Sequence, residues 1–421
     1  MMQPGHIRGA LCALLATLLP VTGAAQIAGG APGGNGFKVG DGRLHPFLDL
    51  ETRIDSGVGY FLDPSTPDPN DVSDNLSGEL VLRLRPGVRM EVPSPRMALN
   101  ASAYLEYVRY TGLLTEQSTY ASHLEGAADV TATFNPNAPV GLIVSDQLLR
   151  TDQTRNVALG AGVLSLFNEL RASVPIKPGG GAFEVTPEAS WGVEFFSPVG
   201  RSIPIGCIEE VCDPLRVDNF DSSTLRAGLD GRWRFLPKTA LVLDTDLDYR
   251  SYFQGSSPDA LLLRVSAGLA GLVSSKISAT AKLGWGHNFG SSGGNTLIAQ
   301  LDGTYLFSPT MTFKAGYYRT LDPVAAYGLY RDDRLFAEAR TLFGGKLTLR
   351  GLVSVDLLGF YDVADPRSDT MLGLDLGADY QFKPWLLGAV GYLLSTRSSS
   401  LEGSGLNYTR NEGYLRLSLV Y

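Results

Sequence analysis

The sequence predicts an all-β protein, folded as a single transmembrane antiparallel up-and-down β-barrel of about 18 strands. Apolar and ionic residues alternate with a period of two along most of the chain, and the connections between these segments alternate between short and long. No segment after residue 25 holds the run of about 18 apolar residues that a membrane helix needs. Because only helices and closed barrels satisfy every backbone polar group in lipid, a membrane form must be a closed sheet.

The composition fits such a fold and excludes some functions. Hydrophobic residues make up 44% of the 421 residues, which is too few for a helical membrane bundle. The 49 glycines, 18 tyrosines and 18 phenylalanines suit many short strands joined by turns. The net charge of −8 argues against a nucleic-acid partner, because phosphate binding needs a basic surface.

The first 25 residues have the layout of a secretory signal peptide. Met1–Arg8 is short and basic, Leu11–Leu19 is apolar, and Gly23–Ala25 supplies small residues for cleavage. The sequence therefore predicts a signal peptide over 1–25, a flexible periplasmic N-terminal segment over 26–42, and an outer-membrane β-barrel over 43–421.

The alternation separates two faces of each expected strand. In Leu44–Asp55, the apolar Leu50 and Ile54 share one parity. The ionic Glu51 and Arg53 share the other, and a helix would mix these two sets. In a membrane barrel the apolar parity faces lipid and the ionic parity faces the lumen. The same division recurs in Leu76–Arg85, Ala182–Phe196, Ser223–Phe235, Thr239–Phe253, Ala260–Val273, Lys276–Phe289, Thr296–Phe307, Met311–Arg319, Arg334–Leu342, Lys346–Leu357, Thr370–Phe382, Trp385–Thr396 and Leu406–Tyr421.

The lengths of the connections test the barrel prediction independently, because outer-membrane barrels have short periplasmic turns and longer outer loops. Short ones are expected at Asn135–Pro139, Pro237–Lys238, Ser274–Ser275, Ser308–Thr310, Gly344–Gly345 and Lys383–Pro384. Longer polar ones are expected at Asp63–Asn75, Ser197–Asn219, Leu321–Asp333, Tyr361–Ser368 and Arg397–Gly405. The alternation puts both ends of the barrel in the periplasm, and the strand count is least clear between Val140 and Val174.

The chain ends in an alternating strand whose last residue is aromatic. Leu415, Leu417, Leu419 and Tyr421 share one parity, and barrels assembled in the outer membrane commonly end this way. An ordinary C-terminal strand is the alternative explanation of this feature alone. We therefore expect the cell outer membrane as the location, with outer-membrane lipid and the barrel-assembly machinery as partners.

The ionic parity holds the candidate functional residues. We expect it to line the lumen with Asp49, Glu51, Arg53, Arg226, Asp230, Arg232, Arg234, Asp244, Asp246, Asp248, Arg250, Arg264, Lys282 and Asp302. These side chains either contact a passing substrate or only keep a water-filled lumen solvated, and their mixed signs disfavour a purely anion- or cation-selective pore. Tyrosines on this parity could let a hydrated glycan slide: Tyr104, Tyr110, Tyr252 and Tyr318.

Two cysteines remain after signal removal, Cys207 and Cys212, in the longest outer connection. An even pair in an exported protein predicts a disulfide. The acidic loop 63–74 offers oxygen ligands that suit Ca²⁺, but it lacks a calcium-loop spacing, so a solvated loop is favoured. The sequence predicts no metal site and no cofactor.

The sequence does not predict an enzyme. The mature histidines, His45, His123 and His287, are scattered over distant strands. His287 shares the lipid-facing parity with Trp285 and Phe289, which is typical of the membrane interface rather than of catalysis. No catalytic residue can be named.

Several stretches of the second half, Phe220–Tyr421, carry a family resemblance through their order and spacing. They are Arg234–Ala240, Asp248–Arg250, Arg264–Leu269, Ser275–Gly284, Tyr305–Thr310 and Gly377–Phe382. Together they resemble the beta-barrel porin 2 family of outer-membrane proteins, and the first half matches less clearly. The resemblance implies a conduit that exports a polysaccharide, as exopolysaccharide or capsule, in Gram-negative bacteria. It also implies a periplasmic polysaccharide-export protein as partner.

Periodicity alone leaves two other functions open. The first is a general solute porin without a dedicated partner. The second is a plugged barrel that serves as a structural or adhesion anchor. Polysaccharide export, general solute diffusion and structural anchoring all require the same fold in the same membrane. They differ in what passes through the lumen.

Overall fold

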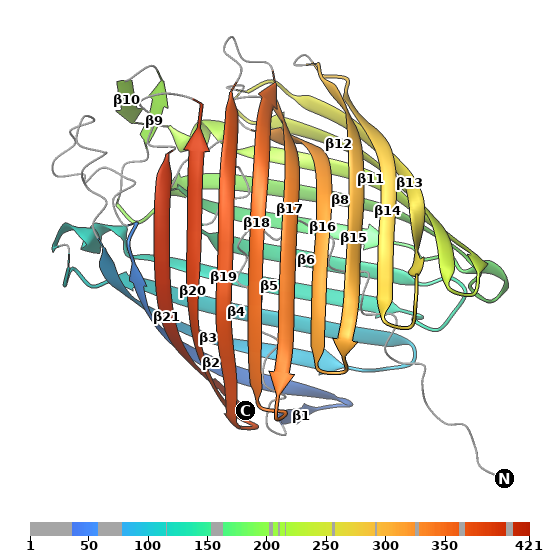
Figure 1. Cartoon of the computed structure of the whole chain (residues 1–421), viewed down its shortest axis with the longest axis horizontal. Helices are drawn as coiled ribbons and strands as arrows, with labels where there is room; N and C mark the ends of the chain where they lie inside the picture. The colour runs from blue at the N-terminus through green and yellow to red at the C-terminus, as the bar shows by residue number, and fades with distance from the viewer. Residues whose placement is uncertain are drawn as a thin grey trace.

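The alternating segments form one closed antiparallel sheet of 18 long strands in the computed structural model of the chain (Figure 1). The structure describes residues 36–57, 78–114, 116–152, 163–201, 205–208, 211–214, 216–254, 257–290, 293–324, 328–361, 367–400 and 407–421. The signal peptide predicted over 1–25 and the acidic loop 63–74 lie outside these residues. The long strands are β2 (Gly42–Asp55), β3 (Glu79–Val92), β4 (Met97–Tyr110), β5 (His123–Phe134), β6 (Leu142–Thr151), β7 (Val163–Ser173), β8 (Phe183–Pro198), β11 (Ser222–Leu236), β12 (Thr239–Tyr252), β13 (Ala260–Leu272), β14 (Ile277–Asn288), β15 (Asn295–Ser308), β16 (Met311–Val324), β17 (Gly328–Phe343), β18 (Leu347–Tyr361), β19 (Ser368–Lys383), β20 (Leu386–Ser399) and β21 (Tyr408–Val420).

Each long strand pairs antiparallel with the next one along the chain, and the last strand closes the ring. β21 pairs with β2, from Phe47 opposite Val420 to Asp55 opposite Glu412. β8 pairs directly with β11, because the intervening β9 (Ile205–Ile208) and β10 (Val211–Pro214) form a hairpin of their own. The predicted up-and-down barrel of about 18 strands is confirmed, and its closure leaves the sheet without a free edge.

Short elements occupy the connections and the start of the barrel. β1 (Phe37–Val39) pairs with the beginning of β2, and the Phe37 ring centroid is 4.8 Å from that of Tyr421. β1 falls in the segment 26–42 that we expected to be flexible, so the ordered barrel begins before residue 43. The described part of the connections holds three short 3-10 helices: η2 (Glu116–Ala121), η3 (Pro178–Gly180) and η4 (Val217–Phe220).

Tight turns join the strands at one end of the barrel, and longer connections join them at the other. β11 and β12 meet across residues 237–238, whereas β8 and β11 are joined at the opposite end by residues 199–221. By the rule for outer-membrane barrels, the tight-turn end is periplasmic and the other end is extracellular. β1 and the C terminus both lie at the tight-turn end (Figure 1). The uncertain region 140–174 holds β6 and β7.

The predicted outer loop at Leu321–Asp333 is wrong. β16 continues to Val324, β17 begins at Gly328, and the two strands pair throughout this region. Polar residues lie on both parities of these strands, because Arg331 and Asp333 share the parity of Leu329 and Asp332 has the other. Leu321 and Leu329 are nevertheless completely buried. Strand pairing therefore continues through the region: β16 extends past its pairing with β15, and β17 stays paired with β18 as far as Leu329.

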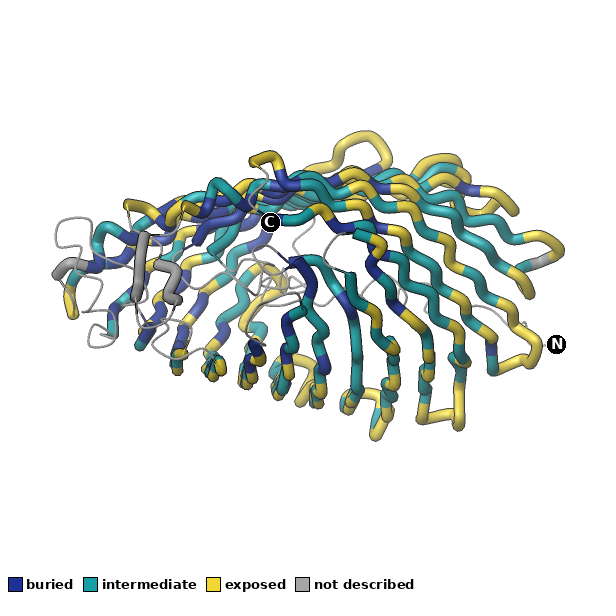
Figure 2. Tube along the Cα trace, turned by 90° about the horizontal axis from the view of Figure 1, so that it is seen from above, coloured by how far each residue is buried: buried dark blue, intermediate teal, exposed yellow. Residues whose placement is uncertain are grey.

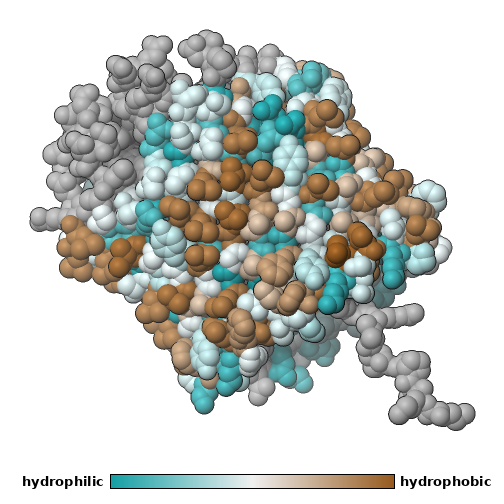
Figure 3. All heavy atoms as spheres, viewed as in Figure 1, coloured by the Kyte–Doolittle hydropathy of each residue, from teal (hydrophilic) through white to brown (hydrophobic). Residues whose placement is uncertain are grey.

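The two faces of the wall differ as the parity predicts. On β11, Leu225 and Trp233 are 56% and 52% exposed, whereas Arg226 between them is half-buried on the opposite face and bonds a carboxylate there. Apolar side chains gather over the outer face of the strands seen in Figure 3. No helix within the described residues is long and apolar enough to cross a membrane. A closed sheet with an apolar outside and an ionic inside is the architecture of an outer-membrane barrel.

Candidate functional site

The inner wall of β11, β12 and β13 carries a chain of ion pairs. The register sets Arg226 directly opposite Asp248, and the Arg226 Nε donates to the Asp248 Oδ1 over 2.6 Å. The Arg264 Nη2 on β13 donates to the other oxygen, Asp248 Oδ2, over 2.5 Å. Asp248 is 2% exposed, so one buried carboxylate is shared by two guanidinium groups. All three residues belong to the predicted lumen lining.

The same arginine reaches a segment three strands away. The Arg264 Nη1 donates to the Asp322 Oδ1 over 2.5 Å and to the Leu321 carbonyl oxygen over 3.2 Å. Arg250 on β12 donates to the Pro323 carbonyl oxygen over 3.3 Å. These residues lie at the end of β16, whose pairing with β15 stops at Arg319. The end of β16 therefore leaves the wall and leans inward, past β14 and β15, to reach β13 and β12.

We call residues 320–324 and 328–332, at the ends of β16 and β17, the mouth hairpin. One side of it packs on the wall: Leu321 and Leu329 form a buried cluster with Leu262 of β13. On the other side, Val324 packs with Leu358 and Phe360 of β18 in a second buried cluster. Because both sides are covered, the hairpin has a fixed position across part of the extracellular mouth.

Two further segments fold inward at the extracellular end. Glu79, which is fully buried, accepts hydrogen bonds from the Thr111 Oγ1 and the Ser118 Oγ, over 2.7 and 2.8 Å, and so fixes the β4–β5 connection. η4 contributes Val217 and Phe220 to a buried cluster that includes Phe196, Tyr252 and Val163. In Figure 2 the tight turns are exposed, and buried segments gather toward the opposite end.

A second group of ion pairs lies where the barrel closes. The Arg53 Nη2 is 2.7 Å from the Glu51 Oε1, and its Nη1 is 2.7 Å from the Glu412 Oε1 on β21. The Arg410 Nη2 is 2.6 Å from the Asp55 Oδ2. We call these five residues the closing seam, because they join the first long strand to the last one. Neighbouring guanidinium groups neutralise these carboxylates.

The seam continues along β3, β4 and β5. The Arg85 Nη2 is 2.7 Å from the Glu106 Oε2, and the Arg83 Nη2 is 3.7 Å from the Glu125 Oε2. Asp49, predicted to line the lumen, is 3.8 Å from the Arg85 Nη1. This part of the wall is almost dry, because the side chains of Glu106 and Arg83 are only 2% and 9% exposed.

The other predicted lumen residues lie nearer to solvent. Lys282 and Asp244 form an ion pair of 2.5 Å, and their side chains are 15% and 29% exposed. Asp302 accepts a hydrogen bond from the Gln300 amide over 2.6 Å. The register sets the remaining predicted residues on the same parity of β11 and β12: Asp230 opposite Asp244, Asp246 opposite Gly228, Arg232 opposite Val242, and Arg234 two residues beyond Arg232.

Sequence reasoning missed several residues of both networks. Asp322 was placed in an outer loop, so its role as a partner of Arg264 was not foreseen. Arg410 and Glu412 alternate with outward residues in the last strand, and that parity could have identified them. The partners of a side chain depend on the register between strands, and the register cannot be derived from the residue pattern of one strand.

Other predicted features have definite positions. Tyr104 lies under the Arg85 guanidinium, 4.9 Å from its centre, and the Tyr318 ring is stacked on Phe336. Tyr110 and Tyr252 are 4% and 7% exposed in buried clusters, which keeps them out of the passage. The register sets Cys207 directly opposite Cys212 in the β9–β10 hairpin, and the disulfide itself stays a prediction.

The histidines divide between the two faces of the wall. His287 stacks on Trp285 at 5.0 Å on the lipid-facing parity. His123 faces inward, and its ligand atoms lie within 4.8 Å of those of Glu125 and Asp152. The Arg83 guanidinium, 3.7 Å from Glu125, offsets part of the acidic charge of this group.

Neither a protein-family model nor a curated protein matches the sequence. Similar solved structures include the siderophore receptor PirA from Pseudomonas aeruginosa, at 9% identity over 90% of this chain and 80% of that one, with a TM-score of 0.46. OccAB3 from Acinetobacter baumannii is 10% identical over 91% of this chain and all (100%) of its own, with a TM-score of 0.46. The outer membrane protein OpdK from Pseudomonas aeruginosa is 11% identical over 90% and 98%, with a TM-score of 0.45.

Proposed function

We propose that this outer-membrane barrel is a general porin, through which small hydrophilic solutes diffuse without a dedicated partner. The observation that carries the proposal is the inner wall of β11–β14, where both signs of charge, such as Asp244 and Lys282, face the interior and keep contact with solvent. A barrel of 16–18 strands encloses an aqueous channel when no segment plugs it.

The mixed charges and the mouth hairpin define what such a channel favours. Acidic and basic side chains alternate on neighbouring strands, so neither cations nor anions are excluded by a single-sign field. The ion pair between Asp322 and Arg264 holds the mouth hairpin across part of the extracellular entrance. We infer that the hairpin limits solute size, while the charged wall favours polar solutes over apolar ones.

Conductance across a planar lipid bilayer tests the proposal directly. The purified barrel is expected to insert with discrete conductance steps in potassium chloride, and with weak selectivity between the two ions. Liposome swelling with sugars of increasing size would then give the size limit. A barrel that inserts but gives no steps would be plugged, and the structural or adhesion function would replace the porin function.

Polysaccharide export with a periplasmic partner is the second candidate, and its support is the sequence resemblance in Phe220–Tyr421. The structure offers less support, because Tyr110 and Tyr252 are buried and cannot contact a sliding glycan. Deleting the gene and assaying surface polysaccharide separates the two candidates. Loss of the polysaccharide with unchanged uptake of small solutes would favour export over the porin function.

A further inference from the structure

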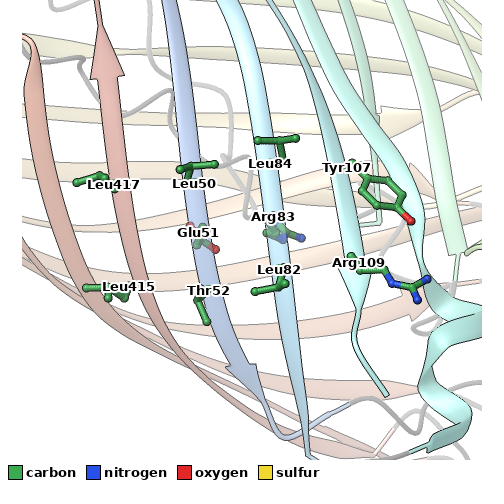
Figure 4. A pocket seen from close by; sticks show the side chains of 10 residues that line it. All are labelled: Leu50, Glu51, Thr52, Leu82, Arg83, Leu84, Tyr107, Arg109, Leu415 and Leu417. Atoms are coloured by element: carbon green, nitrogen blue, oxygen red, sulfur yellow. The ribbon is translucent and has the colours of Figure 1, made fainter. Parts of the chain in front are cut away.

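A shallow pocket of ≈ 500 Å³ lies on the outer face of β21, β2, β3 and β4 (Figure 4). Two rows of outward side chains cross these four strands. The register gives the first row as Leu417, Leu50, Leu84 and Tyr107, and the second as Leu415, Thr52, Leu82 and Arg109. Glu51 and Arg83, between the rows, belong to the inward parity. The pocket floor is therefore apolar, with one guanidinium at its edge.

Arg109 stands at the extracellular end of the pocket. It is the penultimate residue of β4, whereas Leu415 in the same row lies in the middle of β21. The row thus rises toward the extracellular rim, which sets Arg109 on the outer-leaflet side of the lipid-facing wall. A charged residue on the lipid face costs about 2–4 kcal/mol at the bilayer midplane but only about 0–1 kcal/mol near the interface.

A second outward arginine lies two strands farther round the barrel. Arg150 is the penultimate residue of β6, and Leu124 at the start of β5 lies outward between the two arginines. Two strand spacings separate β4 from β6 by roughly 10 Å, and the register sets Arg150 level with Leu105, four residues toward the periplasm from Arg109, so the two arginines are roughly 16 Å apart along the wall. The outward acid nearest along β6 is Asp146, four residues toward the periplasm, and it accepts a hydrogen bond from Asn168 over 2.7 Å.

Arginines elsewhere on the outer face find partners within the chain. Arg319 and Arg331, at the extracellular ends of β16 and β17, are 2.5 and 2.9 Å from the carboxylate of Asp333. Arg109 and Arg150 are exposed, and neither makes an ion pair or a hydrogen bond with any residue that the structure describes. A guanidinium at the lipid face binds an anion strongly, and phosphate matches its planar pair of donors.

We propose that this surface binds a phosphorylated lipid of the outer leaflet. Its acyl chains lie over the leucine rows of the pocket, and Arg109 and Arg150 contact phosphate on its headgroup. The apolar floor and the two cations favour a ligand that carries acyl chains and phosphate in one molecule. Free phosphate would use the arginines and leave the leucines uncovered, and a neutral lipid would do the reverse.

Native mass spectrometry of the detergent-purified full barrel tests the proposal. The probes are diphosphoryl lipid A, a neutral glycosyl diacylglycerol, and inorganic phosphate as a competitor. The variants are the double substitution Arg109→Gln and Arg150→Gln, and Arg319→Gln as the matched outward control. Heat-modifiable migration on a gel checks that each variant is a closed barrel.

The wild-type barrel is expected to retain diphosphoryl lipid A, and the double variant to retain about tenfold less, because charge-assisted hydrogen bonds are lost. Arg319→Gln should retain as much lipid as the wild type. Equal retention by the double variant would overturn the proposal. So would equal retention of the neutral lipid by the wild type, or displacement of lipid A by millimolar inorganic phosphate. The lipid comparison needs no variant, so it decides the matter even if the double variant does not fold.

Discussion

Two groups of ion pairs on the inner wall, the closing seam and the contacts of the mouth hairpin, both pair arginines with carboxylates but differ in burial. In the closing seam, Arg53 bridges Glu51 and Glu412, and all three side chains are at most 10% exposed. At the mouth hairpin, Arg264 bridges Asp248 and Asp322, and the Asp322 side chain is 31% exposed. The seam ties strands that are already paired through their backbones, whereas the Arg264 bridge joins strands that are not neighbours. Loss of the seam weakens the fold, and loss of the bridge frees one segment.

The largest effect is expected in the closing seam. Arg53→Met leaves Glu51 and Glu412 without their shared guanidinium inside a nearly dry wall. Breaking a buried pair from one side costs about 3–5 kcal/mol, so the free energy of unfolding should fall by that amount. Urea unfolding in lipid vesicles would measure it, with Ser418→Ala on β21 as the control. A loss under about 1 kcal/mol would show that the seam does not differ from a surface pair.

The next effect concerns the mouth hairpin. Asp322→Asn removes the charge that Arg264 holds, which weakens a bond worth about 1.5–3 kcal/mol. The hairpin should leave the wall more often, and single-channel conductance should rise while the barrel stays folded. Asp333→Asn is the control, because Asp333 pairs with Arg319 and Arg331 and not with the opposite wall. An unchanged conductance in Asp322→Asn would mean that the bridge does not hold the hairpin in the passage.

A third contact joins the β4–β5 connection, at Tyr120, to the β8–β11 connection, at Gly200. Gly200 has φ of +57°, and a Cβ there would lie 2.2 Å from the Tyr120 carbonyl oxygen. Gly40 has φ of +59° with open space around it, so it shares the backbone strain but not the clash. Gly200→Ala should therefore lower the free energy of unfolding by about 1–3 kcal/mol more than Gly40→Ala. Equal losses would show that the two connections move apart freely.

The smallest effect is expected for the solvated pair in the lumen. Lys282→Gln leaves Asp244 without its cation, but both side chains keep contact with solvent. The free energy of unfolding should change by less than about 1 kcal/mol, and the reversal potential should shift toward cation selectivity. A stability loss as large as that of Arg53→Met would show that the solvated Lys282–Asp244 pair stabilises the fold as much as the buried closing seam does.

The alternation of side chains could be predicted from the sequence because it is local. Leu50 and Glu51 fall on opposite faces of any strand, and a barrel in lipid allows only one assignment of those faces. The strand count and the two ends of the barrel followed from the same pattern. The failure at Leu321–Asp333 arose because a run with polar residues on both parities was taken as a loop, although the two strands stay paired through it.

The sequence by itself determined the class of the fold, the faces of the strands and the set of ionic residues that point inward. Only the tertiary structure decided which of those residues meet. Arg264 bonds Asp322 because the end of β16 bends away from β15 and crosses the interior, and Arg53 bonds Glu412 because the ring closes between β2 and β21. Both contacts depend on register and curvature, which are set by the whole closed sheet and not by any one segment.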